Sequence, residues 1–170
     1  FVWDLRYPQP RAISYEYGIG AVYGVNTPTL PAGAYVLPGR YEVVLKAGAQ
    51  QWRQPLSVLA DPRIATPMAD LQRARAYSMV AAQALDAAYV ANGEVLALRQ
   101  QLTALRPRLR GGLLEAANAL EKKTTVLIKL AEGTDADFGT ISEVIGGLAA
   151  GLEGADFAPT PGQQAGLDDY

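Results

Sequence analysis

The sequence predicts an α+β protein, with antiparallel β-structure in residues 1–63 and an antiparallel bundle of three to four helices in residues 64–170. Three observations support this division. Residues 41–58 alternate apolar and polar side chains with the period of two that is typical of strands. An Asp-Pro-Arg step at 61–63 then interrupts the pattern. From residue 71 onward, apolar residues recur at steps of three and four, which indicates helices.

The stretch from residue 36 to residue 63 is predicted to form a β-hairpin. Leu37–Arg40 contains the Pro-Gly pair of a type II turn, in which glycine supplies the positive φ. Tyr41–Leu45 is the expected first strand, and Trp52–Val58 is the second. Pro55 cannot donate a backbone hydrogen bond, so the second strand should lie at a sheet edge or contain a bulge. Two strands alone are marginally stable in water, and the hairpin therefore needs a further surface to pack against.

The first 35 residues are predicted to be irregular β-structure. Phe1–Arg6 is apolar and aromatic and indicates a strand, which Pro8 and Pro10 end. Ile13–Tyr17 and Ala21–Tyr23 are expected to be short strands within a long loop that aromatic residues pack. Loops of this length usually carry a function or cover something.

A long helix should begin at Thr66 and Pro67, because threonine is a good N-cap and proline suits the first helical position. Arg106, followed by proline, should end it or kink it. Its apolar stripe has nearly coiled-coil spacing and comprises Leu71, Ala74, Tyr77, Ala81, Leu85, Ala88, Asn92, Val95, Leu98, Leu102 and Leu105. We expect the stripe to pack against the third helix through Leu71, Leu85, Leu98 and Leu102. An exposed stripe would instead indicate a homo-oligomer formed through the helices.

Two further helices are predicted, and the last residues indicate a short fourth one. The second helix should end at Gly133. The third should open with the capping box at Thr140–Glu143 and end before Gly154. Thr160, followed by proline, is another N-terminal signal. Because the chain stops at Tyr170, a fourth helix would be short and docked on the others, or truncated.

Composition excludes several classes of function. A net charge of −2 provides no basic field for nucleic acid. Cysteine and histidine are both absent, which rules out disulfides, zinc–thiolate sites, a cysteine nucleophile and the commonest general base. No apolar run approaches the ~20 residues of a membrane span, and no cofactor or metal motif is present. The chain begins at Phe1 in an apparent strand, so we expect it to be a fragment or a processed product.

Three clusters could carry chemistry, and each has a structural explanation. Tyr15–Tyr17 places Glu16 between two phenols, but no second carboxylate is placed to complete an acid/base pair. Glu132, Asp135 and Asp137 lack the spacing of a calcium loop and precede a helix, whose dipole favours acidic residues. Four arginines near the end of the long helix could bind an anion but fit a solvated turn better; they are Arg99, Arg106, Arg108 and Arg110.

Several motifs together resemble a bacterial family. In order, they are FVWDLRY at 1–7, YGIGAVYGVNTP at 17–28, VLPGRYEVVL at 36–45, QPL at 54–56 and DPR at 61–63. They resemble the C-terminal region of large sortilin-like proteins with Asp-box (BNR) repeat β-propellers, which are commonly labelled glycosyl hydrolases or exo-sialidase-like. The first and third motifs also resemble the immunoglobulin-like module of the flagellar hook-capping protein.

The resemblance implies a partial immunoglobulin-like antiparallel β-sandwich in residues 1–63, incomplete at its N-terminus. It also implies a secreted or periplasmic protein whose propeller precedes Phe1. The Asp-box motif itself, Ser-x-Asp-x-Gly-x-x-Trp, does not occur, so no catalytic residue can be transferred. The matching residues have structural roles in that module, and they are Trp3, Asp4, Pro38, Gly39, Tyr41, Asp61 and Pro62.

Three hypotheses about function follow, and in none of them is this chain by itself an enzyme. The leading one is a non-catalytic C-terminal accessory module of a secreted propeller protein, with the upstream propeller as its partner. The second is a carbohydrate-binding module that uses Tyr15, Tyr17, Tyr23 and Trp52. The third is a module whose long Pro/Tyr loop completes the active site of a glycoside-processing enzyme.

Overall fold

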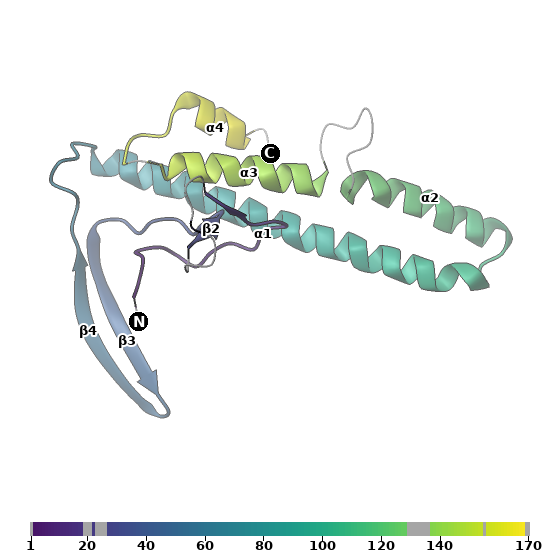
Figure 1. Cartoon of the computed structure of the whole chain (residues 1–170), viewed down its shortest axis with the longest axis horizontal. Helices are drawn as coiled ribbons and strands as arrows, with labels where there is room; N and C mark the ends of the chain where they lie inside the picture. Colours follow the sequence, from purple (N-terminus) through teal and green to yellow (C-terminus); the bar gives the residue numbers. More distant parts are fainter. Residues whose placement is uncertain (1, 19–21, 23–26, 129–136, 155, 169–170) are drawn as a thin grey trace.

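The computed structural model describes residues 2–18, 22, 27–128, 137–154 and 156–168, and its class is α+β as predicted. Four helices pack together, and two small antiparallel sheets accompany them (Figure 1). The strands are β1 (Glu16–Tyr17), β2 (Thr29–Leu30), β3 (Gly39–Ala47) and β4 (Gln50–Val58). The helices are α1 (Met68–Leu105), α2 (Gly111–Ile128), α3 (Phe138–Leu152) and α4 (Pro161–Asp168), with a 3₁₀ turn, η1, at Arg106–Arg108.

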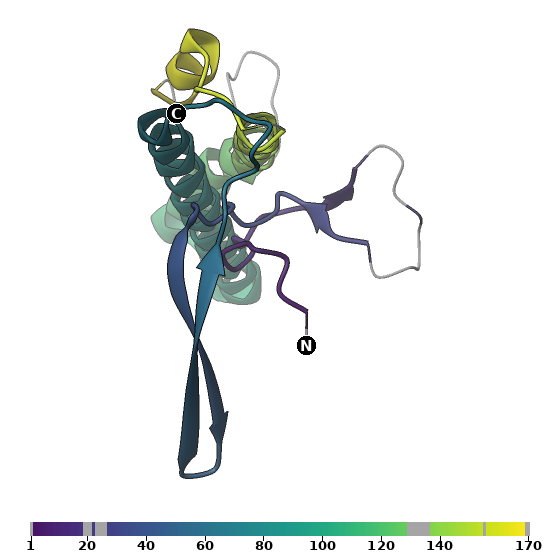
Figure 2. The same cartoon turned by 90° about the vertical axis from the view of Figure 1, so that its left-hand side faces the viewer.

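The predicted immunoglobulin-like sandwich is not formed by the described residues. β1 pairs with β2 and β3 pairs with β4, so each sheet has two strands. The two ribbons also leave the helices in different directions, and the β3–β4 hairpin projects well beyond the rest of the molecule (Figure 2). A sandwich requires two sheets packed face to face, and this arrangement provides only two separate ribbons.

The stretch predicted as a first strand contains a turn. Leu5 has a φ of 62°, which is uncommon outside glycine. The Asp4 carboxylate accepts a hydrogen bond from the Arg6 amide at 3.1 Å, and the Trp3 indole donates to the Arg6 carbonyl at 2.9 Å. These side chains satisfy backbone groups that a strand would pair with a neighbour. Only Arg6 forms a bridge, opposite Tyr35, and the strand prediction is therefore wrong for the described residues of this stretch.

The short strands predicted in the following loop are largely absent. Of Ile13–Tyr17, only Glu16–Tyr17 forms a strand. Of Ala21–Tyr23, only Val22 is among the described residues, and it is not in a strand. The prolines of this segment and hydrogen bonds such as that from the Tyr15 hydroxyl to the Pro10 carbonyl, at 2.8 Å, hold it as a loop instead.

The predicted β3–β4 hairpin is confirmed. Its register runs without a bulge from Gly39 opposite Val58 to Ala47 opposite Gln50. Gly48, with a φ of 58°, occupies the first position of the two-residue turn, where such hairpins favour glycine. The predicted type II turn at Leu37–Arg40 is wrong, because Gly39 has no positive φ and begins β3. The chain enters this strand without reversing its direction.

The long helix is confirmed, including its end at the Arg-Pro step. Its N-cap is Pro67 rather than Thr66, since the Pro67 carbonyl accepts hydrogen bonds from the amides of Asp70 and Leu71. The Thr66 hydroxyl instead donates to the Asp156 carbonyl at 2.5 Å. That bond ties the start of α1 to the segment that follows α3.

The third helix begins earlier than the capping-box prediction placed it. Asp137 is the N-cap, and its carboxylate accepts from the Thr140 amide at 2.7 Å. For α4 the prediction is confirmed, because the Thr160 hydroxyl accepts from the Gln163 amide while the Gln163 side chain accepts from the Thr160 amide. Gly133, the expected end of the second helix, lies outside the described residues.

The hydrophobic core lies between the first half of α1 and α3. Leu85 and Ile145 are fully buried there. The remaining buried members of the core are Ala12, Ala81, Ala149, Leu152 and Leu167. The short α4 is therefore docked through Leu167, which explains how eight residues form a stable helix.

The second half of α1 pairs with α2 instead of α3. Arg99 donates to the Thr125 hydroxyl at 2.6 Å, and Arg106 donates to the Glu121 carboxylate at 2.9 Å. The prediction that the α1 stripe packs on the third helix is confirmed for Leu85. Leu98 and Leu102 lie on the half of α1 that α2 accompanies.

The loop before the hairpin lies against the helices and approaches its own N-terminal arm closely. Arg11 forms an ion pair with Asp86 of α1, and the Ile13 amide donates to the Ser142 hydroxyl of α3. A Cβ added at Gly33 would meet the Tyr7 carbonyl at 1.9 Å, so only glycine fits at this position. The boundary between units at residues 63 and 64 stays a prediction.

Candidate docking surface

The β3–β4 hairpin has one apolar face and one polar face. Residues directly opposite each other in an antiparallel pair share a face, so the register places Leu45 beside Trp52 and Tyr41 beside Leu56. The side chains named here as the apolar face are Tyr41, Val43, Leu45, Trp52, Leu56 and Val58, and Gln54 lies on the same side, opposite Val43. Arg40, Glu42, Lys46, Gln51, Arg53 and Ser57 lie on the other side, together with Val44 and Pro55.

The outer part of the apolar face is open to solvent. Val43 is 51% exposed, Leu45 61% and Trp52 50%. Side chains of this kind normally lie against a second layer. The sequence prediction that the hairpin needs a further surface therefore applies to these residues, which no other element of the described structure covers.

The root of the hairpin is held by the motif residues of the N-terminal arm. The Trp3 ring packs edge-on against Tyr41, with 5.9 Å between ring centroids. The Tyr41 hydroxyl donates to the Leu37 carbonyl at 2.6 Å. Pro38 lies between these two residues of the chain and leads into Gly39, the first residue of β3. Aromatic packing thus covers the root and leaves the tip open.

The Asp-Pro-Arg step ends the hairpin as a turn. The Asp61 carboxylate accepts from the backbone amide and the guanidinium of Arg63, at 2.9 and 2.6 Å, and the Asp61 carbonyl accepts from the Ile64 amide. The hydrogen bonds from Arg63 lower the pKa of Asp61 below its ordinary value. Pro62 stands between them. This turn lies between β4 and α1.

A half-buried ion pair fastens the N-terminal arm to α3. Arg6 pairs with Glu153, and their side chains are 18% and 12% exposed. The Arg6 guanidinium also donates to the Gly33 carbonyl at 2.6 Å and stacks on the Tyr35 ring at 3.6 Å. The Tyr35 amide donates to Glu153 at 3.2 Å. Burial raises the pKa of Glu153, and the hydrogen bond and charge of Arg6 oppose that rise.

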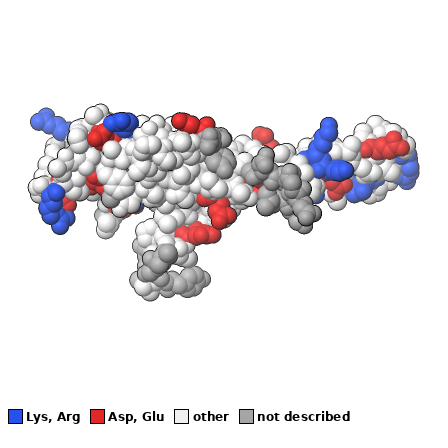
Figure 3. All heavy atoms as spheres, turned by 90° about the horizontal axis from the view of Figure 1, so that it is seen from above, with Lys and Arg blue, Asp and Glu red and all other residues white. Residues whose placement is uncertain are grey.

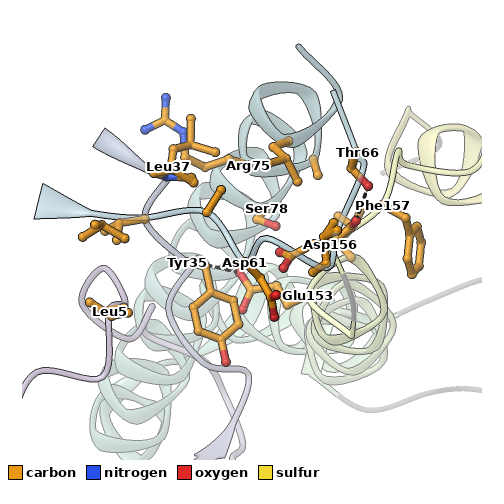
Figure 4. Close-up of a pocket in the computed structure, with 18 of the residues that line it drawn as sticks. Leu5, Tyr35, Leu37, Asp61, Thr66, Arg75, Ser78, Glu153, Asp156 and Phe157 are labelled. Carbon is orange, nitrogen blue, oxygen red and sulfur yellow. Dashed lines mark hydrogen bonds between the residues drawn. The ribbon is translucent and has the colours of Figure 1, made fainter. Parts of the chain in front are cut away.

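A cleft of about 430 Å³ opens where the hairpin root meets α1 and α3. Figure 4 shows Tyr35 and Glu153 side by side in it, with Phe157 at the rim. Its walls are mostly apolar, and Glu153 and Asp61 are already engaged by Arg6 and Arg63. Each of these two carboxylates is thus held by an arginine, and Asp156 is a further acidic residue of the lining.

The aromatic residues proposed to bind carbohydrate do not form one surface. Trp52 lies near the tip of the hairpin, whereas Tyr17 lies in β1. Tyr15 is 44% exposed, and its hydroxyl is held by the Pro10 carbonyl and the Ala12 amide. Tyr23 lies outside the described residues. The hairpin and the β1–β2 ribbon point in different directions (Figure 2), so one small glycan would not contact both.

The charged clusters noted in the sequence have structural partners. Asp137 caps α3, while Glu132 and Asp135 lie outside the described residues. Arg99 and Arg106 join α1 to α2, and Arg110 donates to the carbonyls of the turn between them. Among the described residues, no group of three or more acidic side chains could hold a metal ion.

Charged side chains are unevenly distributed over the surface. The face formed by α3 and α4 carries few charges, and Lys and Arg gather toward the two ends of the molecule (Figure 3). No described helix is both long and apolar enough to cross a bilayer. In the described part of the chain, the hairpin combines open backbone edges with an exposed apolar face.

Comparisons with models of protein families, with characterised proteins and with solved structures found no match to the chain. The resemblance to propeller-associated proteins therefore stays a prediction. What sequence reasoning missed is the Arg6–Glu153 pair, whose members are 147 residues apart. No local pattern could have linked them.

Proposed function

We propose that this chain is a non-catalytic accessory module of a secreted or periplasmic β-propeller protein, and that it docks through the apolar face of its hairpin. The observation that carries the docking role is the exposure of Val43, Leu45 and Trp52 on one face. An apolar face of this kind on a projecting ribbon is typical of an interaction site. The propeller as partner rests on the resemblance of the motifs alone.

The coding sequence that precedes Phe1 tests the propeller context directly. We expect it to encode several Ser-x-Asp-x-Gly-x-x-Trp repeats after a secretion signal. An upstream region without any such repeat would contradict the propeller assignment. It would leave the docking role of the hairpin to be judged by the next experiment.

Docking is tested in the longer protein by comparing Leu45→Glu with Gln51→Glu. Both variants add one carboxylate near the hairpin tip, but only Leu45 lies on the apolar face. If the apolar face is covered in the longer protein, Leu45→Glu should release the hairpin and speed its cleavage by a protease, because a buried charge is costly. Gln51→Glu should leave the cleavage rate near that of the longer protein without a substitution. Equal rates would contradict the docking role.

A carbohydrate-binding module is the alternative that the exposed Trp52 favours, since an exposed indole can stack on a sugar ring. A glycan array on the chain should show a signal that Trp52→Ala abolishes if this alternative holds. A signal that persists in Trp52→Ala, Tyr15→Ala and Tyr17→Ala would exclude it. The third hypothesis, completion of a glycoside-processing active site, predicts that the parent loses activity when residues 1–60 are removed.

A further inference from the structure

The two edges of the hairpin are not equivalent. Ala47 and Gln50 flank a two-residue turn and are opposite each other, so they form a hydrogen-bonded pair. Along an antiparallel ribbon, hydrogen-bonded pairs alternate with non-hydrogen-bonded pairs, which are called open pairs below. The pairs that begin at Lys46, Val44, Glu42 and Arg40 are therefore open, and their amides and carbonyls point away from the partner strand.

Pro55 lies in one of these open pairs, opposite Glu42. The outer edge of β4 thus lacks a donor at its centre, which is the position where an edge strand tolerates proline. The outer edge of β3 has an amide at each of its four open positions, Arg40, Glu42, Val44 and Lys46. A further strand can consequently form a continuous ladder with β3 but not with β4.

The N-terminal arm pairs with the segment that leads into β3. The Val36 amide donates to the Leu5 carbonyl at 2.9 Å, and the Tyr7 amide donates to the Ala34 carbonyl at 2.8 Å. Pro38, where the chain bends, separates residues 34–36 from β3. Trp3 then reaches Tyr41, and beyond that contact the edge is open. A strand added to β3 would therefore pair with an edge that no described strand occupies.

The polar face of the hairpin fixes the chemistry of such a strand. Glu42 is paired with Arg53 across the ribbon. Arg40 and Lys46 have no ion-pair partner in the described part of the chain, although the whole protein has a net charge of −2. In an antiparallel pair, opposite charges placed directly across from each other stabilise the pairing. Carboxylates six residues apart would meet Arg40 and Lys46 together.

We propose that β3 accepts an antiparallel strand from a partner protein on its outer edge, by strand addition. The partner segment is extended, apolar on the side that continues the apolar face of the hairpin, and carries two carboxylates on the other side, six residues apart. The inference rests on the docking role proposed above and adds the edge, the strand direction and the charge of the partner.

The test is a titration of the isotope-labelled chain with the peptide acetyl-Glu-Val-Thr-Val-Thr-Val-Glu-amide, followed by NMR. The amides of Arg40, Glu42, Val44 and Lys46 should shift and exchange more slowly with solvent, whereas those of Gln51, Arg53 and Ser57 should not change. In a peptide with lysine at both ends, both charge pairs become repulsive. Each of them should raise the dissociation constant about two- to fivefold. Protection on β4, or no protection on β3, would overturn the proposal.

Backbone methylation separates a ladder from loose apolar contact. In an antiparallel addition the threonine amides of the peptide point toward β3, and the valine amides point away. Methylation of the threonine nitrogens should abolish binding, and methylation of the valine nitrogens should not. The reverse result would exclude the antiparallel direction, and equal binding by both peptides would exclude strand addition.

Val44→Pro removes one outward amide from β3, and Val44→Thr keeps it as a matched control. Only the proline variant should lose binding, provided that circular dichroism shows the helices unchanged. If the free chain is already a dimer whose β3 amides are protected, a second copy occupies the edge and the proposal is wrong. If the peptide binds β3 but Leu45→Glu is harmless in the parent, the docking role fails while strand addition stands. If the peptide does not bind β3 but Leu45→Glu speeds cleavage of the longer protein, strand addition fails while the docking role stands.

Discussion

The helices and the hairpin use their apolar faces in opposite ways. Leu85 of α1 has no exposed surface and packs in the core with Ile145 of α3. Leu45 of β3 is 61% exposed, although it belongs to an equally regular apolar pattern. Periodicity thus determines which residues share a face, but the presence of a second layer determines whether that face is buried. The hairpin is the part of this chain whose second layer is missing.

Truncation of the core should give the largest effect and sharpen the contrast. Leu85→Ala is expected to lower the free energy of unfolding by about 2–5 kcal/mol, because it leaves a cavity in a packed interior. Urea denaturation monitored by circular dichroism measures this value. A loss below about 1 kcal/mol would mean that α1 and α3 are packed more loosely than the structure indicates.

The ion pair between the arm and α3 predicts a dependence on pH. Burial raises the pKa of Glu153 in the folded chain above the ordinary glutamate value, which it has in the unfolded chain. Between those two values the folded chain holds more protons than the unfolded one, so stability from this group falls as pH rises. Glu153→Gln lacks that titration. Its stability should therefore rise relative to that of the unsubstituted chain as pH increases from about 4 to 7.

Denaturation curves at several pH values measure this difference. Glu121→Gln, at the more exposed pair with Arg106, controls for the simple loss of an ion pair. A difference that changes in the opposite direction would mean that attraction to Arg6 outweighs burial at Glu153.

The cap of α3 should contribute a smaller amount. Asp137→Ala removes the acceptor of the Thr140 amide and is expected to cost about 1 kcal/mol. Asp137→Asn keeps an acceptor and should cost less. If both substitutions are neutral in urea denaturation, the cap does not help to anchor α3 on α1.

The smallest effect is expected at the hairpin tip. Leu45→Ala should change the stability of the isolated chain by less than about 0.5 kcal/mol, because the side chain is already exposed. A loss as large as that of Leu85→Ala would contradict the difference between a buried helix face and an exposed hairpin face. It would mean that the apolar face is covered in solution, for example by a second copy of the chain.

Local patterns predicted the elements whose partners are near in sequence. The hairpin register follows from alternation around Gly48, and α1 follows from an unbroken stripe that ends at Arg106. The predicted strand at Phe1–Arg6 failed because the Asp4 and Trp3 side chains bond to the backbone of Arg6, which alternation does not report. The early start of α3 depends on Asp137, which sequence reasoning explained by the helix dipole and did not identify as a cap.

The candidate surface was only partly predictable. Sequence alternation identified the apolar face, yet it could not separate Trp52 from Tyr15 and Tyr17, because their distance in space depends on where each ribbon leaves the helices. The unequal edges were also implicit in the sequence. Once the turn at residues 48–49 is located, the position of Pro55 decides which edge can accept a strand.

The length of α1 has a consequence for geometry. Its 38 residues span about 57 Å, roughly twice the diameter of a small domain. The hairpin leads into one end of this rod, and the turn to α2 lies at the other (Figure 1). A body held by the hairpin and a body held at the α2 turn would therefore be kept out of mutual reach. The length of α1 thus fixes the separation between the root of the hairpin and the turn to α2.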